Sequence, residues 1–341
     1  MTVSEIAQMA GVSTGTVDRV IHNRGRVSEE TKEKILKIIN ENGYSPDPIA
    51  RFLKKKCEFK IGVLIPAVSE ESGYWQAIYN GIESAAVNDY AAFGFKIELF
   101  GFRRPNRESL TEQFYKMMDS KCSAYIIAPI MQEEILFLLT ERKPEVPYCF
   151  IDSPLPGVNP LCTVAQNPFK AGYLAGKLTR LSGKGDGTYA VIKTFAESYN
   201  QNERTRGFAS YFVQDDNSRA VQKIAAGSTE NDISEAVEKL VIEHNDLRGI
   251  CIVNSEAHFV GAKLCEMQMK DKIVVTGFDL VDQNIVGIKS DMIDCLISQN
   301  PEEQGGMVLK EVYKKLILGK NAEKSVNIPL NIMFKENIDF N

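Results

Sequence analysis

The sequence predicts a fold in two parts, a small all-α head with a helix-turn-helix and a larger α/β body of two lobes with doubly wound parallel sheets. Two observations predict the head: capping residues and glycines divide residues 1–45 into short amphipathic segments, and basic residues follow. A third predicts the body, because from Lys60 onward apolar runs alternate with helical stretches. We therefore expect a head over 1–45, a hinge over 46–59 and a body over 60–341.

The first helix is predicted to start after Thr2, because Thr2 and Glu5 have the spacing of a capping box. Apolar residues then fall on one helical face, at Ile6, Met9 and Ala10. Gly11 predicts a tight turn, since glycine adopts positive φ without steric cost. A third helix is expected from Ser28 to Gly43, with Ile35, Leu36 and Ile39 facing inward.

The second helix carries the most informative face of the head. Ser13 is expected to cap it, and its apolar stripe is Val17, Val20 and Ile21. The opposite face leaves five positions free: Thr14, Gly15, Asp18, Arg19 and His22. A short helix that is polar on one face is suited to enter a DNA major groove.

Charge is unevenly distributed along the chain. The whole chain has a net charge of −5, but residues 1–56 hold 10 basic and 7 acidic residues, a net of +3. The remainder holds 30 basic and 38 acidic residues, a net of −8. A basic head on an acidic body favours nucleic acid as the partner of the head and a different partner for the body. A solvated surface is the alternative.

The hinge is predicted from prolines and bases. Pro46 and Pro48 end the preceding helix, and a short helix over 49–53 would be marginal by itself. Leu53 is an apolar residue among bases, which is the composition of a wedge that kinks a DNA minor groove. A plain linker is the alternative.

Composition argues against several other classes of protein. No apolar run approaches the ~20 residues of a membrane helix, and an amphipathic helix stands where a signal peptide would have its apolar region. Seven scattered cysteines without a C-x-x-C pair fit a reducing cytoplasm. Three distant histidines argue against a zinc site, and we expect neither a metal nor a cofactor.

The body shows the alternation in detail. Strands are expected at 61–66, 96–100, 124–128, 147–151, 187–193, 249–253, 272–278 and 291–297. Helices are expected at 74–90, 168–181, 231–244 and 301–318. Roughly 280 residues exceed one sheet, so we expect two lobes. We place 60–160 and 291–320 in the first lobe, and 161–290 and the C-terminal segment in the second.

Ligands of such sheets bind at the carboxyl ends of the strands, and the crevice between lobes is the expected pocket. Strand ends carry Asp152, Asn254, Asp279 and Gln299. The loop after the first strand carries Ser72, Tyr74 and Trp75, and Arg204 lies on an expected helix. Carboxylates, amides, an arginine and aromatic faces together suit a polyhydroxylated ligand.

Each of these residues also has a structural interpretation. An aspartate at a strand end is often a helix cap, and a lone tryptophan is often part of a core. Asp152 and Asp279 could also be the acid and base of a glycoside hydrolase, although a head that binds DNA argues against an enzyme.

These residues together resemble the lactose-repressor (LacI/GalR) family of bacterial transcription regulators. The resemblance covers essentially the whole chain. In the head it lies in Ile6-Ala-x-x-Ala10-Gly-Val-Ser, Thr16-Val-x-Arg-Val, Val27-Ser-x-Glu-Thr, Gly43-Tyr-x-Pro and Ala50-Arg-x-Leu53. The body resembles a periplasmic sugar-binding fold such as ribose-binding protein, through Ile61-Gly-Val, Arg204-x-x-Gly207-Phe, Gly277-Phe-Asp279 and Gln299-x-Pro301-x-x-x-Gly305.

The resemblance implies roles for individual residues. The DNA-binding set is Ser13, Thr14, Gly15, Thr16, Asp18, Arg19, His22, Arg26, Ala50 and Leu53. The effector-binding set is Ser72, Tyr74, Trp75, Asp152, Arg204, Asn254, Asp279 and Gln299. Asp18 replaces a serine common in this helix, so it either turns toward Arg19 or Arg26 or reads a cytosine amino group.

The resemblance further implies a sequence-specific transcriptional repressor, whose affinity for operator DNA is controlled by a monosaccharide or related polyol in the interlobe cleft. Ser153 stands where ribose-binding protein has an arginine, which argues against ribose. No heptad tail follows the last strand, so we expect a homodimer and not a tethered tetramer. We expect no membrane partner. The alternative is a sugar-binding protein without DNA regulation.

Overall fold

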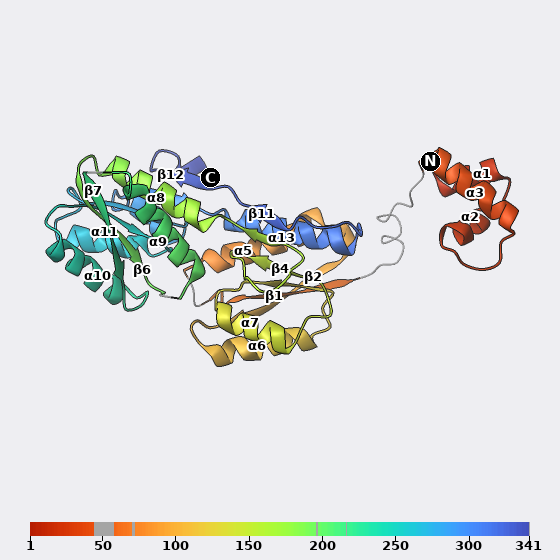
Figure 1. The fold of residues 1–341 in the computed structure, drawn as a ribbon, viewed down its shortest axis with the longest axis horizontal. Helices are drawn as coiled ribbons and strands as arrows, with labels where there is room; N and C mark the ends of the chain where they lie inside the picture. The colour runs from red at the N-terminus through yellow and green to blue at the C-terminus, as the bar shows by residue number, and fades with distance from the viewer. Residues whose placement is uncertain (44–57, 70–71, 196, 216, 341) are drawn as a thin grey trace. The chain divides into compact units, whose positions relative to one another are not determined.

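The computed structural model describes residues 1–43, 58–69, 72–195, 197–215 and 217–340 (Figure 1). The chain divides into two compact units, Met1–Lys55 and Lys56–Asn341. The hinge residues Ala50 and Leu53, predicted to contact DNA, lie outside the described residues.

The first unit is a three-helix head of α1 (Val3–Ala10), α2 (Thr14–Ile21) and α3 (Glu29–Glu41). Thr2 and Glu5 form the expected capping box, and Gly11 has a φ of 72° between the first two helices. The helices enclose a small core of Ile6, Ala7, Ala10, Val17, Val20 and Ile35. Two predictions are wrong: Met9 is 55% exposed and Leu36 is 39% exposed. Ala7, two residues before Met9 on the same helix, is buried in the core instead.

The second unit contains two six-stranded sheets. The first sheet has the order β11-β5-β4-β3-β1-β2. Its strands are β1 (Phe59–Pro66), β2 (Phe95–Phe102), β3 (Ala124–Ile127), β4 (Tyr148–Ile151), β5 (Thr163–Ala165) and β11 (Ser325–Asn327). Every pairing in this sheet is parallel.

The second sheet has the order β12-β10-β9-β8-β6-β7. Its strands are β6 (Gly187–Lys193), β7 (Ser218–Ile224), β8 (Leu247–Ile252), β9 (Val274–Phe278), β10 (Cys295–Ser298) and β12 (Asn331–Met333). The pairing of β10 with β12 is antiparallel and the others are parallel. The order β4-β3-β1-β2 in the first sheet therefore corresponds to β9-β8-β6-β7 in the second.

Helices cover both faces of each sheet (Figure 1). The first lobe has α6 (Arg107–Asp119) and α7 (Gln132–Glu141) on one face, with α5 (Tyr74–Ser84) and α13 (Pro301–Leu316) on the other. In the second lobe, α8 (Pro168–Ser182) and α9 (Tyr199–Phe212) cover one face. The other face carries α10 (Glu230–Glu243), α11 (Ala257–Glu266) and α12 (Asp282–Lys289). The helix expected at 74–90 changes character at residue 85, where η1 (Ala85–Asp89) continues as a π-helix.

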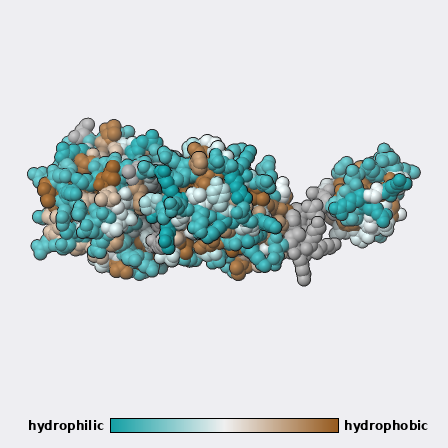
Figure 2. Space-filling model, turned by 90° about the horizontal axis from the view of Figure 1, so that it is seen from below, coloured by the Kyte–Doolittle hydropathy of each residue, from teal (hydrophilic) through white to brown (hydrophobic). Residues whose placement is uncertain are grey.

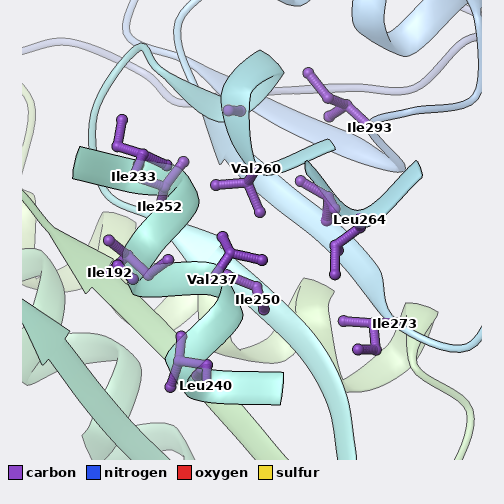
Figure 3. Close-up of a cluster of buried hydrophobic side chains, with 14 of the residues drawn as sticks. Ile192, Ile233, Val237, Leu240, Ile250, Ile252, Val260, Leu264, Ile273 and Ile293 are labelled. Atoms are coloured by element: carbon purple, nitrogen blue, oxygen red, sulfur yellow. The ribbon is translucent and has the colours of Figure 1, made fainter. Parts of the chain in front are cut away.

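Aliphatic side chains fill the space between sheet and helices. Figure 3 shows this packing in the second lobe, where Ile192, Ile250 and Ile252 of the sheet meet Val237, Leu240 and Val260 of the helices. On the face drawn in Figure 2, hydrophobic residues are scattered among hydrophilic ones. No helix among the described residues is long and apolar enough to cross a membrane.

The chain passes between the two sheets three times. It leaves the first sheet after β5, returns to the first lobe between β10 and α13, and leaves again between β11 and β12. The prediction that residues 291–320 lie together in the first lobe is therefore corrected, because β10 pairs with β9 in the second sheet. Likewise β5, expected in the second lobe, pairs with β4 of the first.

Candidate functional site

The polar face of α2 is exposed, as the sequence predicts. The Ser13 hydroxyl caps the helix by accepting the Thr16 backbone N–H at 3.2 Å. Around it, five of the predicted DNA-facing residues are exposed, namely Thr14, Gly15, Asp18, Arg19 and Arg26. Thr16 and His22 are half-buried. The head therefore offers one exposed polar helix face whose start is fixed by a cap.

Asp18 faces neither of the arginines considered from the sequence. Its carboxylate lies 3.5 Å from the imidazole of His22, one turn along the helix. Arg19 instead extends along the turn at Gly25. Gly25 has a φ of 72°, which suits glycine. The pairing with His22 keeps the Asp18 carboxylate on the exposed face.

In the body, the strand-end residues of both lobes meet around one cleft. Asp152 follows β4 and Asp279 follows β9. Both have left-handed backbones, with φ of 72° and 67°. That conformation costs a non-glycine residue roughly 1–2 kcal/mol. Asparagine and aspartate tolerate it better than other side chains do, so these turns suit the residue present.

Arg204 reaches the cleft from α9, and its position depends on close helix packing. At Gly172 of α8, a Cβ atom would overlap the Arg204 carbonyl oxygen, and at Gly207 it would overlap that of Phe169. The two helices can approach this closely only because both positions lack a side chain. This spacing brings the guanidinium between the strand ends of the second lobe.

The guanidinium of Arg204 is held on several sides. It donates to the Val253 carbonyl at 2.8 Å and to the Gln299 side-chain oxygen, and it lies 4.3 Å from the centre of the Phe278 ring. Gln299 in turn donates to Asp279 at 2.7 Å. Arg204, Gln299 and Asp279 therefore form one connected buried group.

Asp152 has a second set of partners. The Tyr74 hydroxyl donates to it at 2.6 Å and the Asn200 amide donates at 2.9 Å. Gln304, on the first turn of α13, donates to the Tyr74 hydroxyl at 3.2 Å and to the Gln299 carbonyl at 3.0 Å. The two carboxylates thus belong to one hydrogen-bonded network that spans both lobes.

Burial raises the pKa of both cleft carboxyls. For Asp279 it raises the pKa to about 6, against the opposing effect of Arg204 and the Gln299 hydrogen bond. Burial also raises the pKa of Asp152, although Tyr74, Arg204 and Asn200 favour its charged form. Burial and the nearby Asp152 raise the pKa of the Tyr74 hydroxyl, which therefore remains a donor at neutral pH.

Two pairs of residues form hydrogen bonds directly across the cleft, from one lobe to the other. Ser72 and Ser255 lie 2.6 Å apart through their hydroxyl oxygens, and Asn200 of α9 reaches Asp152 of the first lobe. The chamber that they enclose has a volume of about 70 Å³. It lies between two hollows of about 920 and 590 Å³, each of which shares residues with it.

All eight predicted effector-site residues line this chamber. Trp75 is 3% exposed and meets the Tyr74 ring edge-on at 5.2 Å, so it also belongs to the core. Asn254 uses its amide to donate to Thr194 at 2.8 Å, which ties it to the wall.

Sequence reasoning missed several lining residues, among them Asn200, Gln201, Arg104 and Phe195. Asn200 lies one helical turn before Arg204, so the spacing of the two residues could have identified it. Arg104 lies 5.0 Å from the centre of the Phe195 ring, on the loop after β2. That loop gave no strand-end signal, because its strand was expected to end at residue 100.

Three buried polar atoms of this network have no hydrogen-bond partner among the described residues: Asn200 Oδ1, Arg204 Nε and Gln304 Oε1. Buried polar atoms are usually paired, so each of these is a candidate for a partner supplied by a ligand. Across the described parts of the chain, no group of three or more His, Cys, Asp or Glu side chains could hold a metal ion.

Comparison with known families matches both units. Residues 2–47 match the family of bacterial regulatory proteins of the lacI family. Residues 61–321 match the periplasmic binding protein domain. The first of these matches covers the head, and the second covers most of the body.

Individual relatives agree with this division. The HTH-type transcriptional repressor PurR of Erwinia tasmaniensis is 30% identical over 176 residues, which are 52% of this chain and 50% of that protein. The HTH-type transcriptional regulator RegA of Clostridium saccharobutylicum is 38% identical over 90 residues, 26% of each chain. The chain thus spans about half the length, or less, of these curated relatives.

Solved structures show a similar body fold. GanP, a glucose-galactose binding protein from Geobacillus stearothermophilus, has a TM-score of 0.74 at 22% identity, over 83% of this chain and 99% of that one. A solute binding protein from Agrobacterium vitis, bound with α-D-tagatopyranose, also has a TM-score of 0.74, at 18% identity, over 82% of this chain and 96% of that one.

Proposed function

We propose that this chain, which belongs to the periplasmic binding protein domain family and carries a lacI-family regulatory head, is a transcriptional repressor controlled by a small sugar or polyol. It would act on operator DNA in the bacterial cytoplasm, without catalysis. The observation that carries the proposal is the combination in one chain of an exposed, capped recognition helix and a buried polar chamber between two lobes.

The DNA-binding half of the proposal rests on α2. Its exposed Thr14, Gly15 and Arg19 would contact base edges, and Arg26 would contact phosphate. We expect a homodimer that pairs mainly through the first lobe, with half-sites one helical turn apart. Light scattering during size-exclusion chromatography tests the dimer, and a monomer at micromolar concentration would contradict it.

The effector half rests on the cleft network. The charged groups that line the chamber are three carboxylates and two guanidiniums, from Asp152, Asp279, Glu256, Arg104 and Arg204, so a neutral polyhydroxylated ligand suits it better than a phosphorylated one. Hydroxyl groups both donate and accept, so they would satisfy the unpaired Asn200 Oδ1 and Arg204 Nε. The ligand would also replace direct contacts between the lobes and so change their closure.

The first experiment is a thermal-shift screen of the full chain against pentoses, hexoses, polyols, nucleosides and sugar phosphates. A ligand at 100 times its Kd adds about 2.7 kcal/mol to the native state, which is a readily measured shift. A stabilising neutral sugar or polyol supports the effector assignment. Stabilisation by sugar phosphates alone, without stabilisation by inorganic phosphate, would contradict it.

The second experiment selects bound fragments from random duplexes and measures their affinity by gel shift at several salt concentrations, with and without the stabilising ligand. Specific binding should weaken steeply with salt. The ligand should change affinity by an amount equivalent to ~1–3 kcal/mol of coupling. If no duplex is enriched, the chain would be a sugar-binding protein without DNA regulation.

A further inference from the structure

Another polar pocket lies beside α9, outside the interlobe cleft. It has a volume of about 300 Å³ and is formed between α9 and the strands β6 and β7. Its polar lining residues are Lys193, Asn202, Thr205, Arg206 and Gln222. Both charged residues of the lining are cationic, and none of the described lining residues is acidic.

Lys193 is the unusual member of this pocket. It is the last residue of β6 and is only 9% exposed. Among the described residues, its ammonium has one hydrogen-bond partner, the Asn202 side-chain oxygen at 2.6 Å. An ammonium group has three donors, and a buried cation is costly unless an anion compensates it. The remaining lysines of this lobe with comparable burial are paired: Lys263 with Glu238 and Lys270 with Asp294.

Arg206 borders the same pocket on its exposed side. Its guanidinium pairs with Glu203 at 2.6 Å and lies 4.9 Å from the centre of the Phe169 ring, and neither of these two partners lines the pocket. Thr205 and Gln222 add a hydroxyl and an amide to the lining. Ammonium, guanidinium, hydroxyl and amide groups are the donors that phosphate oxygens accept in proteins.

We propose that the pocket at Lys193 is a second ligand site, which binds a phosphate group, either free or on a small phosphomonoester. The site is separate from the cleft but adjacent to its wall. Thr194 and Phe195, which follow Lys193, donate their backbone N–H groups to the Gln201 side chain at 2.9 and 3.2 Å. Gln201 lines the cleft chamber and Asn202 lines the pocket, so neighbouring residues of α9 face the two sites.

The test is calorimetric titration of the full chain with inorganic phosphate and with glycerol phosphate, at an ionic strength kept constant with chloride. The variants are Lys193→Met and a matched control, Lys223→Met. Lys223 lies opposite Ile192 in the neighbouring strand and already pairs with Glu243 of α10 at 3.0 Å. Both variants lose one cation, so any binding of phosphate to the basic head is common to them.

The expected result is a phosphate Kd that rises at least tenfold in Lys193→Met and stays within twofold of the parent in Lys223→Met. Equal effects of both substitutions, or no phosphate binding by the parent beyond the chloride control, would overturn the proposal. A selenate-soaked crystal of the parent gives a readout that does not depend on a variant. An anomalous peak within hydrogen-bond distance of Lys193 Nζ supports the site, and peaks only elsewhere contradict it.

Discussion

Asp152 and Asp279 occupy equivalent places in the two lobes. Asp152 directly follows β4, which lies two positions from β1 in its sheet, and Asp279 directly follows β9, which lies two positions from β6. Both residues have a left-handed backbone, with φ of 72° and 67°. Strain of this kind clusters at ligand sites, where the surrounding structure holds it in place. The repeated turn aims one carboxylate from each lobe at the same chamber, and each carboxylate is held by different neighbours.

The raised pKa of Asp279 predicts a pH-dependent stability. Its folded pKa of about 6 exceeds its ordinary value of 3.8, so the folded state binds the proton more tightly. The free energy that this tighter proton binding adds to folding is present in full below pH 4 and is lost as pH rises through 6. Relative to Asp279→Asn, the parent should lose up to about 3 kcal/mol of unfolding free energy over that window. Urea unfolding of both proteins at pH 4 and pH 7 measures it, and a difference that does not vary with pH would contradict the assignment.

Arg204→Gln should abolish stabilisation by the effector. The substitution also leaves Asp279 and Gln299 without their cationic neighbour, so the variant should unfold at a lower temperature than the parent. Arg206→Gln is the control, because Arg206 lies on the same helix with 65% of its side chain exposed. Arg204→Lys keeps the charge without the planar fork, so it should preserve folding better and still bind the effector weakly. A ligand-induced Tm shift that survived in both Arg204 variants would be inconsistent with this cleft.

Gly172→Ala should weaken effector binding without changing any residue of the cleft. The added methyl group would overlap the Arg204 carbonyl oxygen, so α9 must move away from α8 and carry the guanidinium with it. Gly306→Ala is the matched control on α13, because its Cβ would meet only Ala85, at 4.0 Å. Overpacking of this kind typically costs about 1–3 kcal/mol. Equal Tm values and equal effector Kd values for the two variants would show that the close approach is not needed.

Asp18→Asn distinguishes two roles for the carboxylate on α2. If Asp18 only pairs with His22, removing its charge lessens repulsion from phosphates and should tighten DNA binding a few-fold at low salt, as for an exposed charge pair of 0.2–1 kcal/mol. Screening should reduce the gain as salt rises. Glu41→Gln is the control, because it removes the same charge from α3. Weaker binding to the selected site alone would instead indicate that Asp18 accepts a hydrogen bond from a base.

The sequence pattern was sufficient to predict the helices of the head and the central strands of the two sheets. Capping residues and apolar spacing place α1 and α2, because both signals are local. They fail at Met9 and Leu36, which lie at the margin of a small three-helix core where a neighbouring apolar residue can take the buried position. Buried central strands such as β6 are continuous apolar runs, and the prediction matches β6 at both ends.

The strands β5, β7, β11 and β12 were not predicted from the sequence. β7 alternates partly buried and exposed residues, and β5, β11 and β12 have only three residues each. Their positions depend on pairing with distant strands, which periodicity does not report. The lobe of β10 was misassigned for the same reason. The cleft residues were easier to find, because the carboxyl ends of parallel strands meet at one edge whatever the lobe.

The three passages of the chain between the sheets have a consequence for synthesis. Ribosomes make the head first, and the core residues described for its three helices all lie within residues 1–43. Neither sheet is complete until β11 and β12 have been made, more than 280 residues later. A chain interrupted before Cys295 would lack strands of both lobes and the helix α13, yet would keep every element of the head. If the proposed function is correct, such fragments would present the exposed face of α2 to DNA without a complete cleft for an effector.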